Sequence, residues 1–245
     1  MLSVDGLTAG YGKLRILEKV TVSAQAGEVT VIVGPNGSGK STLLKAIGGV
    51  ATVHEGSVRL DSRELTKLKP HEIARAGIAY LPQVDSTFAG LTVTENFRMA
   101  AYTVPRDQVD TRLRTSLEVF PRLSQYSKEK VSNLSGGERQ MVAMTMALIR
   151  NPTVVMLDEP TANLAPKIAT EVLSKVRSLA KELRLTVLLV EQNAKKALEL
   201  GDKAFLLVSG KNAFSGAASD LLHNKELARL YLGLAADGDS GPAGL

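Results

Sequence analysis

A glycine-rich stretch near the start of the chain has the residue types that bind a row of phosphates. It reads Gly34, Pro35, Asn36, Gly37, Ser38, Gly39, Lys40, Ser41 and Thr42. Glycines allow consecutive backbone N–H groups to point inward at phosphate oxygens, and a helix that starts near Lys40 would aim its positive end at the same anion. The spacing predicts that Lys40 reaches the β- and γ-phosphates of a nucleoside triphosphate and that the Ser41 hydroxyl binds Mg²⁺.

Two carboxylates follow a short apolar run later in the chain. Val154–Leu157 is followed directly by Asp158 and Glu159. A buried strand that ends in acids can deliver them to a phosphate site, where Asp158 would hold Mg²⁺ and Glu159 would polarise the attacking water. Alone, such a run fits an ordinary strand end equally well. Together with the phosphate loop it predicts phosphoryl transfer to water.

A third stretch, Leu134–Gln140, reads Leu-Ser-Gly-Gly-Glu-Arg-Gln. Ser135 and the N–H groups of Gly136 and Gly137 would lie at the N-terminus of a helix that begins near Glu138, which is a second place where an anion can bind. A plain helix cap is the alternative interpretation. One chain has no evident need for two triphosphate-binding surfaces, so the second surface calls for an explanation.

The stretch around Ser135 resembles the signature motif of the ABC-transporter ATPases. In that family two ATPase domains sandwich ATP head to tail, and the signature of one faces the phosphate loop of the other. The resemblance covers nearly the whole chain. It implies an α/β fold: a phosphate-loop NTPase core with a parallel central sheet, an N-terminal antiparallel β part and a helical insertion subdomain. We expect one ABC ATPase domain over 1–234, with the core at about 1–83 and 151–234, the insertion at about 84–150, and a disordered tail at 235–245.

The same resemblance suggests roles for three more residues. Tyr11, between two glycines, stands where the family places an aromatic ring on adenine, although a packed surface tyrosine is the alternative. Gln83, in Leu-Pro-Gln, matches the loop residue that contacts Mg²⁺ and links the core to the insertion. Gln192 stands where the family usually has a histidine that contacts the γ-phosphate; its amide can donate an N–H but cannot become cationic. Ala165 replaces a usual aspartate, so a hydrogen bond across the dimer is expected to be missing.

Four further stretches point to one subgroup within the family. Gly90–Asn96, Leu164–Pro166, Val190–Ala194 and Ala228–Gly233 are similar to the second ATPase subunit of branched-chain amino acid importers. The implied cofactors are ATP and Mg²⁺. The implied partners are a second ABC ATPase subunit, related but different, two membrane permease subunits that dock on the region after Gln83, and indirectly an external solute-binding protein.

The cargo stays open at this stage. Importers of urea and short amides share much of the pattern, and an exporter or an importer of another solute would keep the same fold. A soluble ABC ATPase that acts on nucleic acid or ribosomes is a further alternative, supported mainly by the net charge of +5. With no Trp, five Phe and five Tyr, the chain has few aromatic residues for stacking on bases, and we expect no nucleic-acid partner.

Composition sets the remaining limits. The 245 residues include no cysteine, which excludes thiolate nucleophiles and cysteine-bound metals. The sequence contains no apolar run of about 18 residues and no signal-peptide pattern at its start. We therefore expect a chain that stays in the cytoplasm, and the resemblance implies a peripheral subunit on the cytoplasmic face of the cell membrane. His54, His71 and His223 lie outside every motif and are expected at the surface.

Periodicity predicts the elements that position these motifs. A helix from Lys167 carries an apolar stripe of Ile168, Val172, Val176, Leu179 and Leu183, with Pro166 at its start. Other helices are expected at 107–120, 138–150 and 193–200, and strands at 18–25, 28–33, 56–60, 154–157, 186–190 and 203–208. Short apolar strands that alternate with helices indicate a parallel sheet covered on both faces.

Overall fold

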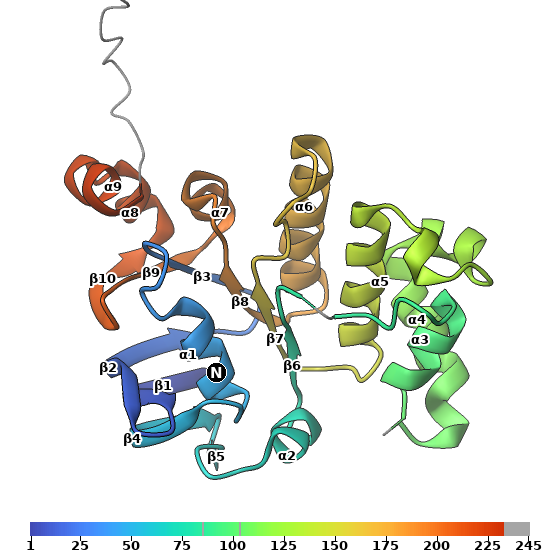
Figure 1. The fold of residues 1–245 in the computed structure, drawn as a ribbon, viewed down its shortest axis with the longest axis horizontal. Coiled ribbons are helices and arrows are strands. Elements are labelled where there is room, and N and C mark those ends of the chain that lie inside the picture. Colours follow the sequence, from blue (N-terminus) through green and yellow to red (C-terminus); the bar gives the residue numbers. More distant parts are fainter. Residues whose placement is uncertain (85, 103, 233–245) are drawn as a thin grey trace, which may run out of the picture.

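The computed structural model describes residues 1–84, 86–102 and 104–232 (Figure 1). Its strands form two sheets. The strands are β1 (Leu2–Tyr11), β2 (Leu14–Ala24), β3 (Val29–Val33), β4 (Thr52–Leu60), β5 (Arg63–Glu64), β6 (Ile78–Leu81), β7 (Val154–Asp158), β8 (Thr186–Val190), β9 (Lys203–Val208) and β10 (Lys211–Ala217). One sheet is antiparallel with the order β2-β1-β4-β5, and the other has six strands in the order β10-β9-β3-β8-β7-β6.

Helices cover the larger sheet and extend beyond it. They are α1 (Lys40–Ile47), α2 (Pro70–Arg75), α3 (Val93–Ala100), α4 (Val109–Val119), α5 (Gly136–Leu148), α6 (Pro166–Glu182), α7 (Ala194–Leu200), α8 (Ala218–His223) and α9 (Lys225–Leu232). Short 3₁₀ turns lie at Arg106–Gln108, Pro121–Tyr126 and Val131–Asn133. In Figure 1, α6 and α7 lie on one side of the six-stranded sheet, and α1 and the antiparallel sheet lie on the other.

The six-stranded sheet is buried on both faces. Every residue of β3, β7 and β8 is buried. Within β7, Val155 and Leu157 pack with α5 and α6, whereas Val154 and Met156 pack with α1 and the antiparallel sheet. Because side chains alternate along a strand, a strand between two such layers must be apolar throughout, as parallel strands usually are.

The parallel part of this sheet brings the carboxyl ends of its strands to one edge. β3 is parallel to both β8 and β9, and β7 is parallel to β8 and β6. The loops that follow β3, β6, β7 and β8 therefore emerge together, and ligands of open α/β sheets bind at this edge. Each of these loops carries a predicted site residue.

Three helices form a group at one end of the molecule. α3 and α4 each contact α5, and Figure 1 shows the three beside one another, away from the antiparallel sheet. This is where a helical insertion is expected, and its limits at about 84–150 remain a prediction. The predicted tail at 235–245 lies outside the described residues.

The structure differs from the expected elements in several places, and three of these have a clear physical reason. β10 runs antiparallel to β9, so the central sheet is mixed rather than wholly parallel. The signature helix begins at Gly136, not near Glu138, because the Ser135 side chain already caps it. The apolar stripe of α6 is shorter than predicted, because Leu183 follows the last turn and is 52% exposed.

Candidate functional site

The phosphate loop lies between β3 and α1, as predicted. Gly39 is the N-cap of α1, with φ of 101°, and a Cβ atom on it would lie 2.5 Å from Leu17 Cδ2. Gly34 has φ of 150°, and a Cβ atom there would lie 2.1 Å from the Leu207 carbonyl oxygen. Both positions need glycine, because a side chain would be strained and would collide with its neighbours.

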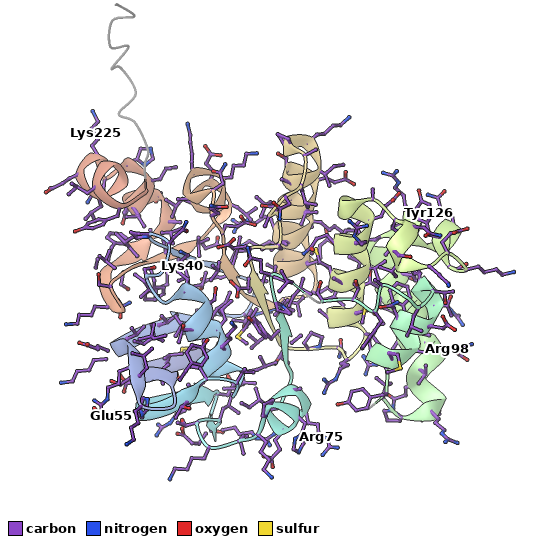
Figure 2. The ribbon with its side chains drawn as sticks, in the orientation of Figure 1. Lys40, Glu55, Arg75, Arg98, Tyr126 and Lys225 are labelled. Carbon is purple, nitrogen blue, oxygen red and sulfur yellow. The ribbon has the colours of Figure 1, made fainter. Side chains whose placement is uncertain are left out.

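Lys40, the first residue of α1, places its ammonium group inside this loop. Its Nζ donates to the carbonyl oxygens of Gly34 at 2.9 Å and Pro35 at 3.0 Å, and the residue is only 6% exposed. Burial lowers the pKa of Lys40, although the negative charges of Glu159 and Asp158 act in the opposite direction. Figure 2 shows Lys40 at the start of α1, on the side of the molecule away from Arg98 and Tyr126.

An orphaned polar atom in the loop is a further sign that it fits an anion. The Ser38 hydroxyl is buried and has no hydrogen-bond partner among the described residues. A buried polar group without a partner is costly, and a ligand is one way to satisfy it. The loop thus combines the Lys40 ammonium group, glycine backbone N–H groups and the Ser38 hydroxyl, and this combination suits the oxygens of a phosphate.

Asp158 accepts two hydroxyl hydrogen bonds at the end of β7. Ser41 Oγ donates to its Oδ1 at 2.9 Å, and Tyr80 Oη donates to its Oδ2 at 3.0 Å. Asp158 itself is only 3% exposed. Burial, and next the nearby Asp158 charge, raise the pKa of Tyr80, so its hydroxyl stays a donor. A carboxylate and a serine hydroxyl side by side supply the oxygen ligands that Mg²⁺ prefers.

Gln83 and Glu159 meet across the same edge of the sheet. Gln83 Nε2 donates to Glu159 Oε2 at 2.8 Å, although 76 residues separate them in the sequence. Glu159 has a positive φ of 49°, and its backbone N–H donates to the Val190 carbonyl at 2.8 Å. A non-glycine residue in this conformation is held there by its surroundings, and such residues often gather at functional sites.

These side chains border one open cleft of about 470 Å³. Its lining consists of Ile16, Asn36, Gly37, Gly39, Lys40, Ser41, Thr42, Gln83, Glu159 and Gln192. Apart from Ile16, all were predicted as site residues from the sequence. Tyr11 is not among the lining residues; it ends β1, is 43% exposed, and its contact with adenine stays a prediction.

A buried acid links the two loops on the far side of this cleft. Glu191 follows β8, is 3% exposed, and its Oε1 accepts from the Thr161 backbone N–H at 3.0 Å and from the Thr161 hydroxyl at 2.8 Å. Burial is the main cause that raises the pKa of Glu191, and the charge of Glu159 acts in the same direction. The loop of Glu159 and the loop of Gln192 are thereby tied together.

The signature residues lie elsewhere in the molecule. Ser135 is the N-cap of α5: its backbone N–H and its hydroxyl both donate to Glu138 Oε2, at 2.8 Å and 2.7 Å. Gly136 and Gly137 form the first turn of this helix. Figure 1 shows α5 well separated from α1, so the same chain does not bring Ser135 to Lys40.

The structure adds functional candidates that the sequence did not single out. Tyr80, Glu191 and Thr161 each bond to a predicted site residue or to the loop that carries one. A tyrosine in the apolar stretch before Gln83 is a signal that could have been noticed for Tyr80. Of the histidines, His71 and His223 are exposed as expected, but His54 is half-buried.

Comparison with known proteins identifies the family. The family model described as "ABC transporter" matches residues 17–162. The chain belongs to the ABC transporter family. It is therefore an ABC-type ATPase, as the signature motif predicted.

Similar proteins agree with this membership. The chain is 51% identical to "Probable branched-chain amino acid transport ATP-binding protein LivF" of Archaeoglobus fulgidus, over 96% of this chain and 99% of that protein. It is 38% identical to "High-affinity branched-chain amino acid transport ATP-binding protein BraG" of Pseudomonas aeruginosa, over 95% and 100%. A crystal structure of the ADP conformation of an ATP-binding cassette of an ABC transporter superposes with a TM-score of 0.84 at 26% identity, covering 94% of this chain and 97% of that one. The predicted fold class is thereby confirmed.

No helix within residues 1–84, 86–102 and 104–232 of this ABC ATPase is both long and apolar enough to cross a membrane.

Proposed function

We propose that this ABC ATPase is the motor subunit of an importer of branched-chain or related amino acids. One observation carries the proposal: Lys40 and Ser41 at the start of α1, and Gln83 and Glu159 from two other segments, border a single cleft in a chain that is 51% identical to a LivF-type protein. The fold alone would not identify a cargo. The high identity over nearly the full length of both chains is what favours amino acids over urea, amides or an exported solute.

Each residue of the cleft has a proposed task. Lys40 and the N–H groups of the glycine loop bind the β- and γ-phosphates of ATP, and Ser41, Gln83 and Asp158 hold Mg²⁺. The metal ion neutralises charge on the phosphate oxygens when it is bound. Glu159 accepts the proton of the attacking water.

Gln192 and the hydrogen bond between Gln83 and Glu159 complete this assignment. Gln192 donates its amide N–H to the γ-phosphate, and its charge does not change with pH. In the present structure Gln83 occupies Glu159 Oε2. This bond occupies one oxygen of the carboxylate, so Oε1 can still accept a proton from water while Gln83 keeps the side chain in place.

A second ATPase subunit completes the site. Ser135, Gly136 and Gly137 stand at the N-terminus of α5, where backbone N–H groups and the helix dipole favour an anion. Because α5 and α1 are far apart in one chain, these residues would bind the triphosphate held by a mate. The mate is proposed to be a related but different chain.

The membrane partners have a suitable surface beside the cleft. We call it the lateral groove: a cavity of about 390 Å³ bordered by Ile73, Tyr80, Phe88, Tyr102 and Met146, among others. Phe88 is 49% and Tyr102 71% exposed. Exposed large apolar side chains around a groove mark an interaction surface, and the segment of a permease subunit is its proposed occupant. The ATPase would work there as a peripheral subunit on the cytoplasmic face.

Glu159→Gln tests the central assignment. The amide keeps the shape of the side chain but cannot accept a proton, so the variant should bind Mg·ATP and lose at least about 99% of steady-state hydrolysis, as expected when a general base that contributes 10²- to 10⁴-fold is removed. Hydrolysis is measured by phosphate release, with Glu182→Gln on the exposed end of α6 as control. Normal hydrolysis by Glu159→Gln would remove Glu159 from its role. Co-purification with the permeases, followed by uptake of labelled leucine and urea, tests the cargo.

A further inference from the structure

Tyr80 faces two functional regions at once, and neither the phosphate motifs nor the comparisons give it a task. It belongs to β6, the last strand in the order of the six-stranded sheet. Tyr80 pairs with Met156 of β7 in parallel register. Asp158 lies two residues beyond Met156, so it stands on the same face of the sheet, diagonal to Tyr80. This geometry allows the phenol to reach the carboxylate.

The contact with Asp158 divides the two carboxylate oxygens between two neighbours. Tyr80 Oη donates to Oδ2 at 3.0 Å, and Ser41 Oγ donates to Oδ1 at 2.9 Å. The oxygen beside Ser41 is the one that faces the proposed metal position. Tyr80 therefore holds the other oxygen and fixes the rotation of this carboxylate. Asp158 is only 3% exposed.

The same side chain also borders the lateral groove. Tyr80 lines it together with Leu81 and Pro82, which lead directly to Gln83. Ile73 of α2, Met146 of α5, Phe88 and Tyr102 line the same groove, and Phe88 and Tyr102 are exposed. Tyr80 thus lines the groove and contacts the acid at the end of β7.

We propose that Tyr80 is a positioning residue that orients Asp158 for Mg²⁺ and transmits to it the occupancy of the lateral groove by a permease segment. This inference rests on the proposed function, because it uses the proposed metal site and the proposed partner. The hydrogen bond from Tyr80 keeps Oδ1 directed at Ser41. A segment that presses on the ring from the groove side changes that hydrogen bond and, with it, the affinity for the metal ion.

Physical chemistry gives the expected size of the effect. Groups that hydrogen-bond to a metal ligand typically change metal affinity 10- to 100-fold when they are removed. Tyr80→Phe removes only the hydroxyl, leaves the ring in the groove, and leaves one buried oxygen of Asp158 without its donor. The low end of that range, about tenfold, is expected because Asp158 keeps Ser41 as a neighbour.

The first experiment measures binding and not turnover. Isothermal titration calorimetry gives the affinity of the full chain for a β,γ-imido ATP analogue, once with EDTA and once with Mg²⁺. In Tyr80→Phe the affinity in EDTA should stay within about twofold of the wild-type value, and the gain caused by Mg²⁺ should fall about tenfold. A general loss of structure would weaken both measurements, so it cannot produce this pattern.

Tyr231→Phe is the matched control. It removes the same hydroxyl from α9, outside the residues that line the lateral groove. Its affinities should equal those of the wild type with and without Mg²⁺. An unchanged Mg²⁺-dependent gain in Tyr80→Phe would overturn the positioning role.

The second experiment tests the link to the groove. The Mg²⁺ concentration for half-saturation of analogue binding is compared between the isolated subunit and its complex with the permeases. Assembly should shift this concentration severalfold in the wild type and in Tyr231→Phe. The shift should be less than about twofold in Tyr80→Phe, because this variant lacks the hydroxyl that links the groove to Asp158. Equal shifts in all three proteins, or none in the wild type, would overturn the link.

Failure of this inference and failure of the proposed function are distinguishable. If the wild-type chain does not bind the analogue with Mg²⁺ at all, the proposed function fails. If it binds normally and Tyr80→Phe behaves identically, only the role of Tyr80 is lost.

Discussion

Glu191 is an acid in a buried setting, unlike most acids of a protein. It is 3% exposed, and both hydrogen bonds on its Oε1 come from Thr161. Those bonds favour the charged form, but burial outweighs them and raises the pKa of Glu191. The folded chain is therefore more stable when Glu191 is neutral than when it is charged.

This imbalance predicts how stability changes with pH. The folded state keeps a proton on Glu191 at pH values where the unfolded chain has released it, so the contribution is fully present below the ordinary value of 4.5. It decreases as the pH rises through the raised folded-state pKa. Glu191→Gln keeps the oxygen acceptor and cannot ionise. Above pH 4.5 its free energy of unfolding should fall less steeply than that of the wild type, with a total difference of about 1.4 kcal/mol for each unit by which the pKa of Glu191 is raised.

Urea unfolding at several pH values measures this difference. Glu182→Gln, which removes an exposed acid from the end of α6, serves as control and should keep the wild-type slope. An identical pH dependence in Glu191→Gln and the wild type would mean that Glu191 is charged in the folded protein throughout.

At the residue scale, the sequence predicts which residues belong to the candidate site better than it predicts which of them contact one another. The residues of the phosphate loop and the acids after β7 are recognisable because their chemistry is confined to short stretches. The hydrogen bonds from Gln83 to Glu159 and from Tyr80 to Asp158 cannot be recognised in the sequence in this way. Both depend on β6 pairing with β7, which joins segments 76 residues apart. Local patterns contain no information on such strand order.

At the scale of elements, the close approach of α5 and α6 explains one signature glycine. A Cβ atom on Gly137 would lie 2.6 Å from Cγ2 of Ile168, at the start of α6, whereas one on Gly136 would lie 3.4 Å from Cδ2 of Leu164. Cγ2 of a β-branched side chain cannot move aside, because χ1 is restricted. The tip of a leucine can. Gly137 is therefore required for packing as well as for any contact with phosphate.

Gly136→Ala and Gly137→Ala form a matched pair that tests this. Alanine gains up to about 1 kcal/mol over glycine within a helix, and overpacking costs about 1–3 kcal/mol. Gly137→Ala should thus unfold about 1–2 kcal/mol more easily than Gly136→Ala in urea, without nucleotide. Adding Ile168→Ala should recover most of the difference between the two. If both single variants are equally stable, the spacing of α5 and α6 is not what demands glycine.

The predicted elements also show where local patterns fail. The strands 186–190 and 203–208 and the helix from Pro166 are confirmed because their periodicity and length are unambiguous. β10 was not predicted: as an outer strand it is mostly exposed and carries little apolar pattern. β6 has only four residues, and β1 has irregular register with both of its neighbours. Tertiary pairing decides such strands, not propensity.

At the scale of the molecule, the chain holds two helix ends that are proposed to bind anions and that lie too far apart to serve one ligand. Lys40 begins α1 and Ser135 caps α5, and these helices lie on different sides of the structure (Figure 1). Two copies, or this chain and its mate, can bring one end of each kind together if they pair head to tail. Such a pair has two equivalent composite sites, as two-fold symmetry requires for identical chains.

Mixing two defective variants tests the composite arrangement. Lys40→Ala removes the cation of the phosphate loop. Ser135→Asp keeps a good N-cap for α5 but directs a negative charge at the incoming triphosphate. Each variant alone should be nearly inactive, because every site in its dimer lacks one half. In an equal mixture half of the dimers are mixed and contain one intact site, so hydrolysis should recover to roughly a quarter of the wild-type rate. Recovery would show that two copies of this chain suffice. If hydrolysis does not recover, but the variants are active when paired with a related second subunit, the mate is a different chain.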